Sequence, residues 1–363
     1  MTLPTDNPRL IRVLVADDSA FMRTAITRMI ESDPGMRVAS TAQTGQEALD
    51  KIAALQPDVV TLDVEMPGLN GLETLKRIMK DSPRPVIMVS SLTQEGAETT
   101  LEALGIGAFD YVPKQQSFVS LDIVKIRDDL VAKIRAAAEN GRRQFRPRPA
   151  KPQPAAPPKA AAAAHAHPPV NIVALGTSTG GPKALQEILP MLPKDLPVGV
   201  LIVQHMPKGF TGPFARRLNG LCKVSVREAA QEEIIEPGAV YIAPAGQHMT
   251  VHRHTASKFS LRLSNTPDHV LHIPSVDVMM LSVAETFRSN CLGVIMTGMG
   301  ADGLQGMEAI SRNGGVTVGQ DEPTCTVYGM PRSCAEKGIL QRVVPLNQIP
   351  EQILLATHYR PRT

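Results

Sequence analysis

Tryptophan is absent from this 363-residue sequence, and aromatic residues make up only 3% of it. Any hydrophobic core must therefore be packed from aliphatic side chains and methionine. No apolar run approaches the roughly 18–20 residues of a membrane-spanning helix, and residues 1–9 are too polar for a secretory signal. Direct insertion into a membrane is therefore not expected.

The sequence also lacks a large excess of charge of one sign, and it lacks closely spaced cysteine pairs. Lys and Arg number 38 against 35 Asp and Glu, a net charge of +3, and no basic stripe is interleaved with aromatic residues. Nucleic acid is thus not expected as a partner. No C-x-x-C pair occurs, which favours free, mostly buried thiols in a reducing cytoplasm at Cys222, Cys291, Cys325 and Cys334.

What the sequence does contain is two stretches in which short apolar runs alternate with helical patterns. The first predicts five strands and five helices, which is typical of a doubly wound parallel sheet. The strands are expected at Ile11–Ala16, Arg37–Thr41, Val59–Leu62, Val86–Val89 and Asp110–Val112. The helices are expected at Phe21–Ile30, Gln46–Leu55, Leu72–Lys80, Glu95–Leu104 and Leu121–Ala138.

The second stretch predicts another α/β domain with a larger, mostly parallel sheet. A hairpin is expected within it at His248–His252 and Lys258–Leu263. The strands are expected at 171–176, Val198–Val203, Val224–Val226, Val240–Ala243, Leu292–Met296 and Val316–Gly319.

Between the two stretches, residues 141–169 are rich in Pro and Ala and include the run PRPAKPQPAAPPKAAAAA. Such a composition cannot build a core and predicts an extended linker. Its histidines, His165 and His167, are interpreted as solvated spacers rather than as a metal site. We therefore predict one domain at 9–140 and another at 170–360.

Two predicted strands of the first domain end in carboxylates. Asp17 and Asp18 follow the strand VLVA, and Asp63 ends VVTLD. The carboxyl ends of parallel strands meet at one edge of the sheet, where such folds bind ligands. An acidic pair alone could merely cap the next helix. Three carboxylates together repel unless a cation neutralises them, and hard oxygen ligands suit Mg²⁺.

Two further strand ends carry partners for the same site. Ser90 offers a hydroxyl to a phosphoryl oxygen, and Lys114 offers a cation. All four elements at successive strand ends favour a phosphoryl-accepting site over helix capping. By these residues, about the first 125 residues resemble a response-regulator receiver domain.

The resemblance implies a flavodoxin-like five-stranded parallel sheet. It also implies that Asp63 accepts a phosphoryl group from a histidine kinase. Mg²⁺ is then expected to be held by Asp17, Asp18, Asp63 and the backbone carbonyl of Glu65.

The receiver resemblance further assigns roles to residues near the predicted acceptor. Ser90 is the implied switch hydroxyl, Lys114 the implied lysine, and Tyr111 matches the family's rotating aromatic. Gln115 follows Lys114 where many receivers have proline, so the family's cis-proline anchor for that loop is not expected.

In the second domain, the strand IVALG runs into the turn TSTGGP. Ser178 lies in a Gly-x-Ser-x-Gly pattern, with Pro182 expected at the first helical position and Gly181 at the cap before it. A strand-to-helix turn of this kind exposes the serine at the positive end of a helix and offers amides to an oxyanion. The pattern therefore indicates a nucleophile.

A glycine turn after a first strand could instead cradle a dinucleotide. The spacing here is not G-x-G-x-x-G, and the next strand ends in Gln204 and His205 without an acidic residue for a ribose. Dinucleotide binding is therefore disfavoured. His205 becomes a candidate general base, on the strand expected beside that of Ser178.

Asp302 follows a later strand and a glycine turn. Its simplest role is helix capping, and it can orient His205 as well only if its carboxylate has spare acceptor capacity. The order Ser–His–Asp differs from that of α/β-hydrolases, but geometry defines the roles. Rival bases are His248, His269 and His272, of which His248 better suits a structural or substrate-contact role.

Six motifs agree in order with one family: GTSTGGP, QHMPKGFT, APAGQHM, HIPSVD, TGMGADG and DEPTCTVYGMP. Together they resemble the catalytic domain of chemoreceptor protein-glutamate methylesterases. The resemblance implies that Ser178 is the nucleophile, His205 the base and Asp302 the orienting carboxylate. Thr179 and Met299 are the implied neighbours of the oxyanion.

The implied reaction is phosphorylation-activated hydrolysis of γ-glutamyl methyl esters on methyl-accepting chemotaxis receptors, with deamidation of certain receptor glutamines. The implied partners are these receptors and a chemotaxis histidine kinase, in the cytoplasm at receptor arrays. Mg²⁺ is expected for receiver phosphorylation, and no cofactor for the esterase.

Two alternative functions differ from the implied reaction. A DNA-binding output is disfavoured because the sequence has no helix-turn-helix pattern or basic patch. A receiver-gated hydrolase of a small diffusible ester stays open, because the motifs predict the chemistry better than the substrate.

Overall fold

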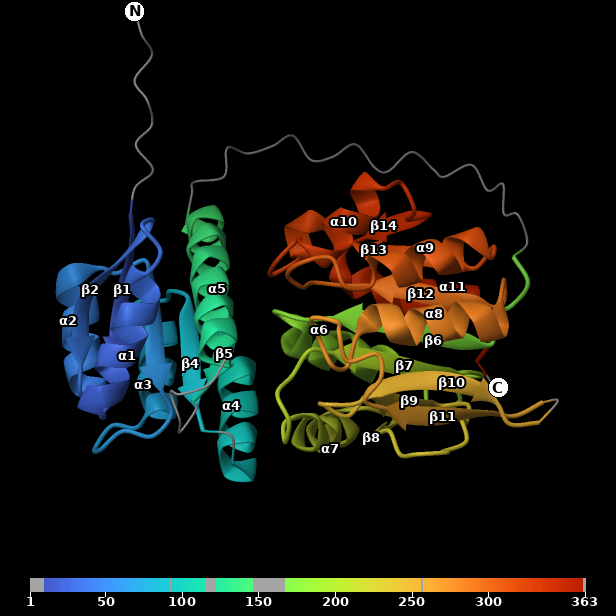
Figure 1. Cartoon of the computed structure of the whole chain (residues 1–363), viewed down its shortest axis with the longest axis horizontal. Helices are drawn as coiled ribbons and strands as arrows, with labels where there is room; N and C mark the ends of the chain where they lie inside the picture. Colours follow the sequence, from blue (N-terminus) through green and yellow to red (C-terminus); the bar gives the residue numbers. More distant parts are fainter. Residues whose placement is uncertain (1–9, 92, 115–121, 146–166, 256, 362–363) are drawn as a thin grey trace, which may run out of the picture. The chain divides into compact units, whose positions relative to one another are not determined.

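The computed structural model of the chain describes residues 10–91, 93–114, 122–145, 167–255 and 257–361. These residues divide into two compact units on either side of residue 145, each a sheet covered by helices (Figure 1). We call them the N-terminal and C-terminal units. Most of the predicted linker, with His165, lies outside the described residues. Among the described helices, none combines the length and apolar character that crossing a bilayer requires.

The N-terminal unit is a five-stranded sheet in the order β2-β1-β3-β4-β5, with every strand pair parallel. This confirms the predicted architecture. Its strands are β1 (Ile11–Ala16), β2 (Met36–Ala42), β3 (Val59–Asp63), β4 (Val86–Ser90) and β5 (Asp110–Pro113). Its helices are α1 (Ala20–Glu31), α2 (Gly45–Leu55), α3 (Gly71–Asp81), α4 (Gln94–Ile106) and α5 (Asp122–Phe145).

Local sequence explains why these helices begin where they do. The side chains of Ser19, Thr44, Asn70 and Thr93 each accept a hydrogen bond from a backbone N–H in the first turn of α1, α2, α3 and α4. Such caps satisfy amides that have no partner inside a helix. Helix α5 continues to Phe145, past the domain boundary predicted at residue 140.

The C-terminal unit is a seven-stranded sheet in the order β14-β13-β12-β6-β7-β9-β8, again with every pair parallel. Its strands are β6 (Ile172–Thr177), β7 (Gly199–Gln204), β8 (Ser225–Glu228), β9 (Ala239–Ile242), β12 (Cys291–Ile295), β13 (Val316–Gln320) and β14 (Arg342–Val344). The predicted strands are confirmed, and β14 was missed because it is a short edge strand of mixed polarity.

Helices pack on both faces of this sheet (Figure 1). They are α6 (Gly181–Ile188), α7 (Thr211–Leu221), α8 (Val276–Phe287), α9 (Leu304–Arg312), α10 (Met330–Glu336) and α11 (Ile349–Ala356). The predicted hairpin is present as β10 (His248–Arg253) and β11 (Phe259–Ser264), which pair antiparallel. The hairpin is tied to α8 by the Val251 amide, which donates to Ser282 Oγ.

The chain enters this sheet at its central strand, β6, and the strand order reverses there. β7 lies on one side of β6 and β12 on the other. In open parallel sheets, ligands bind outside the carboxyl ends of strands at such a reversal. The fold therefore directs attention to the residues that follow β6, β7 and β12.

The end of the predicted linker differs from expectation at one residue. The Nε2 atom of His167 lies 2.7 Å from the carbonyl oxygen of Gly314. The interpretation of His167 as a solvated spacer was therefore wrong, because its ring binds the C-terminal unit. The four cysteines are free, and two of them, Cys291 and Cys334, are buried.

Candidate active site and acidic cluster

The turn that carries Ser178 connects β6 to α6. Its shape depends on Gly180, which adopts a φ of +78° that residues with side chains rarely adopt. A Cβ added at this position would lie 2.4 Å from Thr326. The Gly181 amide donates to the carbonyl oxygen of Ser178 over 2.8 Å, which closes the turn. α6 thus begins at Gly181 with Gly180 as its cap, one residue earlier than predicted.

Buried polar side chains lie beneath this turn at the ends of neighbouring strands. Thr297 accepts at its carbonyl from the Ser178 amide over 3.0 Å and from Thr177 Oγ1 over 2.8 Å. Its hydroxyl donates to the carbonyl of Thr179, and its amide donates to Gln320 Oε1. The turn is therefore held from below by residues at the ends of β12 and β13, on one side of β6, which fixes the backbone that carries Ser178.

His205 follows β7 directly, and the register of β6 with β7 places it beside the Ser178 turn. The prediction that these two strands adjoin is confirmed. His205 Nε2 lies 2.8 Å from Asp302 Oδ2, while Nδ1 is buried without a hydrogen-bond partner among the described residues. Nδ1 is therefore the nitrogen left to act on a substrate or on Ser178.

Asp302 receives four donors. Oδ2 accepts from His205 and from the Val276 amide at 2.7 Å, and Oδ1 accepts from Ser275 Oγ at 2.8 Å and the Asp277 amide at 3.0 Å. A carboxylate has about four acceptor sites, so all are used. Capping and histidine orientation therefore coexist, but the helix that Asp302 caps is α8 rather than its own helix, α9.

These bonds decide the charge of Asp302. Burial alone would raise its pKa, but the hydrogen bond and charge of His205 and the amides of Asp277 and Val276 hold the pKa well below its ordinary range. Asp302 is thus a permanent carboxylate that can orient an imidazole and stabilise an imidazolium.

Asp277 makes the reciprocal contact with α9. Its Oδ1 accepts from the Gly306 amide at 2.8 Å, in the first turn of α9. Burial raises the pKa of Asp277 to about 6, the Gly306 amide opposes this, and the Asp302 charge adds to it. Asp302, just before α9, therefore caps α8, and Asp277, in the first turn of α8, caps α9, which fixes the two helices side by side.

The rival histidines separate clearly. His248 is fully buried, with Nε2 2.9 Å from the carbonyl of Pro267 and Nδ1 accepting from the Ser275 amide at 3.1 Å. It supports the start of α8. His272 stacks on His205, with ring centroids 4.0 Å apart. His269 is exposed. Of these histidines, His248 is committed to two backbone contacts and His272 lies against the ring face of His205, whereas His205 itself faces a carboxylate.

Two backbone amides near Ser178 are available to an oxyanion. Within the described residues, the backbone amides of Thr179 and Met299 have no protein acceptor. The Thr179 amide belongs to the segment after β6, and the Met299 amide belongs to the segment after the neighbouring strand β12. Free, preorganised amides at that place suit a developing negative charge.

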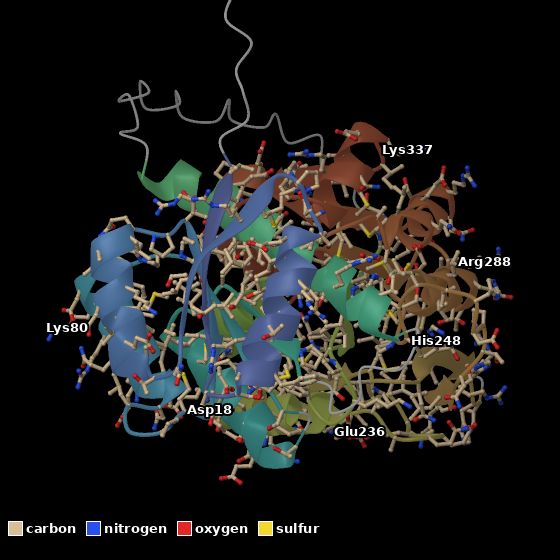
Figure 2. All side chains as sticks on the ribbon, turned by 60° about the vertical axis from the view of Figure 1, so that its left-hand side comes forward. Asp18, Lys80, Glu236, His248, Arg288 and Lys337 are labelled. Carbon is tan, nitrogen blue, oxygen red and sulfur yellow. The ribbon has the colours of Figure 1, made fainter. Side chains whose placement is uncertain are left out.

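The predicted acidic cluster is present in the N-terminal unit. One carboxylate oxygen from each of Asp17, Asp18 and Asp63 lies within 4.8 Å of the others. Asp17 and Asp63 are buried, and Asp18 is exposed beside the start of α1 (Figure 2). Lys114 Nζ lies 2.5 Å from Asp63 Oδ2 and 3.0 Å from Asp17 Oδ2.

The electrostatics of this cluster fit a cation. Burial raises the pKa of Asp63 to about 6, with Lys114 opposing and Asp17 adding to the shift. Asp17 Oδ2 is buried and faces Lys114 Nζ at 3.0 Å, so one lysine serves both Asp17 and Asp63. A divalent cation would neutralise the charge that this one lysine leaves among the three carboxylates, so the residues fit Mg²⁺. The Glu65 amide donates to Asp63 Oδ1 at 3.2 Å, which brings Glu65 to the same edge.

Ser90 and Tyr111, to which the receiver resemblance assigns switch roles, lie on β4 and β5, and each makes a contact that the sequence did not predict. Ser90 is buried and donates to the carbonyl of Gly96 at 3.1 Å. Tyr111 is buried, and Lys133 of α5 donates to its carbonyl at 2.7 Å. Gln115 lies outside the described residues. No sequence pattern indicated the Lys133 contact, because the acceptor is a backbone carbonyl and every residue carries one.

Known proteins share both units. Residues 173–353 match the family model described as CheB methylesterase, and residues 13–123 match the response regulator receiver domain model. A protein-glutamate methylesterase/protein-glutamine glutaminase 1 of Oleidesulfovibrio alaskensis is 46% identical, over 96% of this chain and 100% of the relative. One of Pyrococcus horikoshii is 44% identical, over 96% of this chain and 94% of the relative. The solved catalytic domain of Thermotoga maritima CheB methylesterase is 39% identical, covering 51% of this chain and 98% of that chain with a TM-score of 0.50.

Proposed function

This chain belongs to the protein-glutamate methylesterase/protein-glutamine glutaminase family and is a hydrolase with a receiver domain; on that premise we propose that it demethylates and deamidates chemotaxis receptors under phosphorylation control. The substrates are γ-glutamyl methyl esters and certain glutamines of methyl-accepting receptors. Ser178 is the nucleophile, His205 the base and Asp302 the orienting carboxylate.

One observation carries the hydrolytic assignment. The 2.8 Å contact between His205 Nε2 and Asp302 Oδ2 lies at the same sheet edge as the Ser178 turn, and Asp302 is saturated by donors. A carboxylate held this firmly fixes both the tautomer and the orientation of the imidazole. It leaves Nδ1 of His205 as the proton acceptor.

The reaction follows from this geometry. His205 Nδ1 takes the Oγ proton as Ser178 attacks the ester carbonyl, and the amides of Thr179 and Met299 hold the oxyanion. The tetrahedral intermediate collapses, and the methoxy group leaves as methanol with the proton from His205. Water, deprotonated by His205, then releases the glutamate carboxylate and frees Ser178. A glutamine amide loses ammonia by the same steps.

The receiver supplies the control. Asp63 accepts the phosphoryl group from a chemotaxis histidine kinase, and Asp17, Asp18, Asp63 and the Glu65 carbonyl would hold Mg²⁺. The metal would supply positive charge that offsets the charge of the phosphoryl oxygens and the carboxylates. Ser90, Tyr111 and Lys114 are the switch residues that respond to the modification.

The domain division proposed for this mechanism is a receiver at 9–140, a linker at 141–169 and a catalytic domain at 170–360. The matched ranges, 13–123 and 173–353, fall inside it. Because the proposed substrates are chemotaxis receptors, the proposed location of the protein is the cytoplasm, at receptor arrays.

The test is methanol release from methylated receptors by the purified full chain. Ser178→Ala should abolish release, while Ser257→Ala, an exposed serine of the same unit, should leave it unchanged. Small methyl esters are measured in parallel. Equal or faster turnover of the small esters would favour a small diffusible substrate, and near-normal release by Ser178→Ala would refute the nucleophile.

A further inference from the structure

Gln204 occupies an unusual position between the two residues that exchange the proton. It ends β7, is 2% exposed, and pairs across the sheet with Thr177 of β6. Its Nε2 atom donates to the carbonyl of Ser178 at 3.1 Å and to the carbonyl of His205 at 2.9 Å. A single side-chain amide thus uses both of its hydrogens on the nucleophile and the base.

The orientation of this amide follows from its acceptors. Turning the amide over would bring its oxygen against two carbonyl oxygens, which is unfavourable. In the observed orientation, Oε1 is buried and has no donor among the described residues. A buried acceptor without a donor is costly for stability, and an apolar side chain of the same size would avoid that cost. The benefit of the amide therefore lies in its two donated bonds.

Gly181 makes room for this arrangement. A Cβ at Gly181 would lie 2.0 Å from Gln204 Oε1 and 2.4 Å from Thr177 Oγ1. The glycine that begins α6 is thus needed to let the Gln204 side chain pass beneath the Ser178 turn. The carbonyl of Ser178 accepts from both the Gly181 amide and Gln204, so both of its lone pairs are engaged.

We propose that Gln204 is a positioning residue for the hydrolytic reaction: it ties the Ser178 turn to His205 and so sets the distance across which the proton moves. The proposal rests on the proposed roles of Ser178 and His205. Without the bridge, the two backbone segments separate at the carboxyl ends of β6 and β7, and Ser178 loses alignment with Nδ1. A misplacement of about 1 Å can cost on the order of 100-fold in rate.

The experiment compares Gln204→Met, which keeps the length but removes both donors, with Gln204→Asn, whose shorter amide cannot reach both carbonyls. We measure kcat and KM for methanol release by the full chain, the rate at which a small fluorophosphonate labels Ser178, and Tm. The expected result for Gln204→Met is a fall in kcat of about 10- to 100-fold, an unchanged KM, and a parallel fall in labelling rate. Gln204→Asn should fall less.

Gln352→Met is the matched control, because Gln352 is also buried and hydrogen-bonded, to Arg342 of β14. It should leave kcat and labelling unchanged. If both Gln204 variants label and turn over at the wild-type rate, the proposal is wrong, whatever happens to Tm. If Gln204→Met does not fold, Gln204→Asn decides by the same criterion. Absence of labelling at Ser178 in the wild-type chain would instead refute the proposed function.

Discussion

The rings of His205 and His272 stack with centroids 4.0 Å apart and planes 20° apart. His272 belongs to the segment just before α8, the helix whose start also binds Asp302. The imidazole of His205 is therefore restrained at its edge by a carboxylate and on its face by a second ring. Its orientation toward Ser178 is a product of both contacts.

Replacing His272 by phenylalanine should largely preserve activity, because a flat ring of similar size keeps the face of His205 covered. His272→Ala should lower kcat for methanol release by about 2- to 10-fold, the worth of one aromatic contact. The measurement is steady-state kinetics on methylated receptors. A loss in His272→Phe as severe as in His205→Ala would identify His272 as the base instead.

Asp302→Asn should lower kcat by roughly 10⁴-fold, because an amide favours the wrong tautomer of the histidine. It should also lower Tm, since the amide nitrogen cannot accept from the N-terminus of α8. Asp321→Asn is the control, because Asp321 caps a short helix elsewhere, with Oδ1 accepting from the Thr324 amide. Comparable losses in the two variants would mean that Asp302 acts through stability alone.

The Asp277 carboxylate should make stability fall as pH rises from about 4 to about 6. Its folded pKa, raised to about 6, exceeds the ordinary value of 3.8, so the folded state holds the proton more tightly in that window. With its Asp277 carboxylate ionised above pH 6, the fold is therefore less stable than it is with this group protonated. Asp302, whose folded pKa is depressed, acts in the opposite sense at lower pH.

Asp277→Asn removes this titration and keeps one acceptor for the Gly306 amide. The Tm of the variant minus that of the wild type should be more positive at pH 7 than at pH 4.5, for the transition of the C-terminal unit. Thermal melts at the two pH values check this. A difference of the opposite sign would show that the charge of Asp277 stabilises the fold at neutral pH.

Asp63→Asn should abolish phosphate incorporation from a phosphodonor, and chelation of Mg²⁺ should do the same to the wild-type chain. The reason is that the acyl phosphate forms on Asp63 and needs a cation among the three carboxylates. Radiolabel incorporation checks both. Asp58→Asn is the control, since Asp58 lies in the same unit, outside the acidic cluster, and accepts from the Arg12 amide at 2.8 Å. Labelling of Asp63→Asn at the wild-type rate would place the acceptor elsewhere.

A chain that begins just before Val170 should hydrolyse methylated receptors at least about 5-fold faster than the unphosphorylated full chain. This start keeps the bond from the Val170 amide to the carbonyl of Ala356 and removes the contact of His167 with Gly314. The gain should be smaller on a small ester. If the shortened chain is no faster on receptors, the receiver must act by activation or recruitment rather than by restraint.

Local patterns predicted much of this molecule. Strand and helix periodicity predicted both α/β units, and glycines around Ser178 predicted a strand-to-helix turn. Errors arose at element ends, where tertiary contacts decide: α6 begins at Gly181 because that amide already bonds Ser178, and α5 continues to Phe145. Strand β14 was missed because it is a short, largely exposed edge strand, which only its pairing with β13 defines.

By itself, the sequence determined which residue types stand at the ends of which strands, because periodicity and turn residues are local properties of the chain. Only the tertiary structure decided how they combine. Asp302 and His205 are 97 residues apart in sequence, and Gln204 and Ser178 are 26 apart. Which nitrogen of His205 is left for the proton, which helix Asp302 caps, and what bridges Ser178 to His205 all depend on such distant contacts. No local pattern encodes them, since each side chain could satisfy its hydrogen bonds in several ways until the packed fold leaves one.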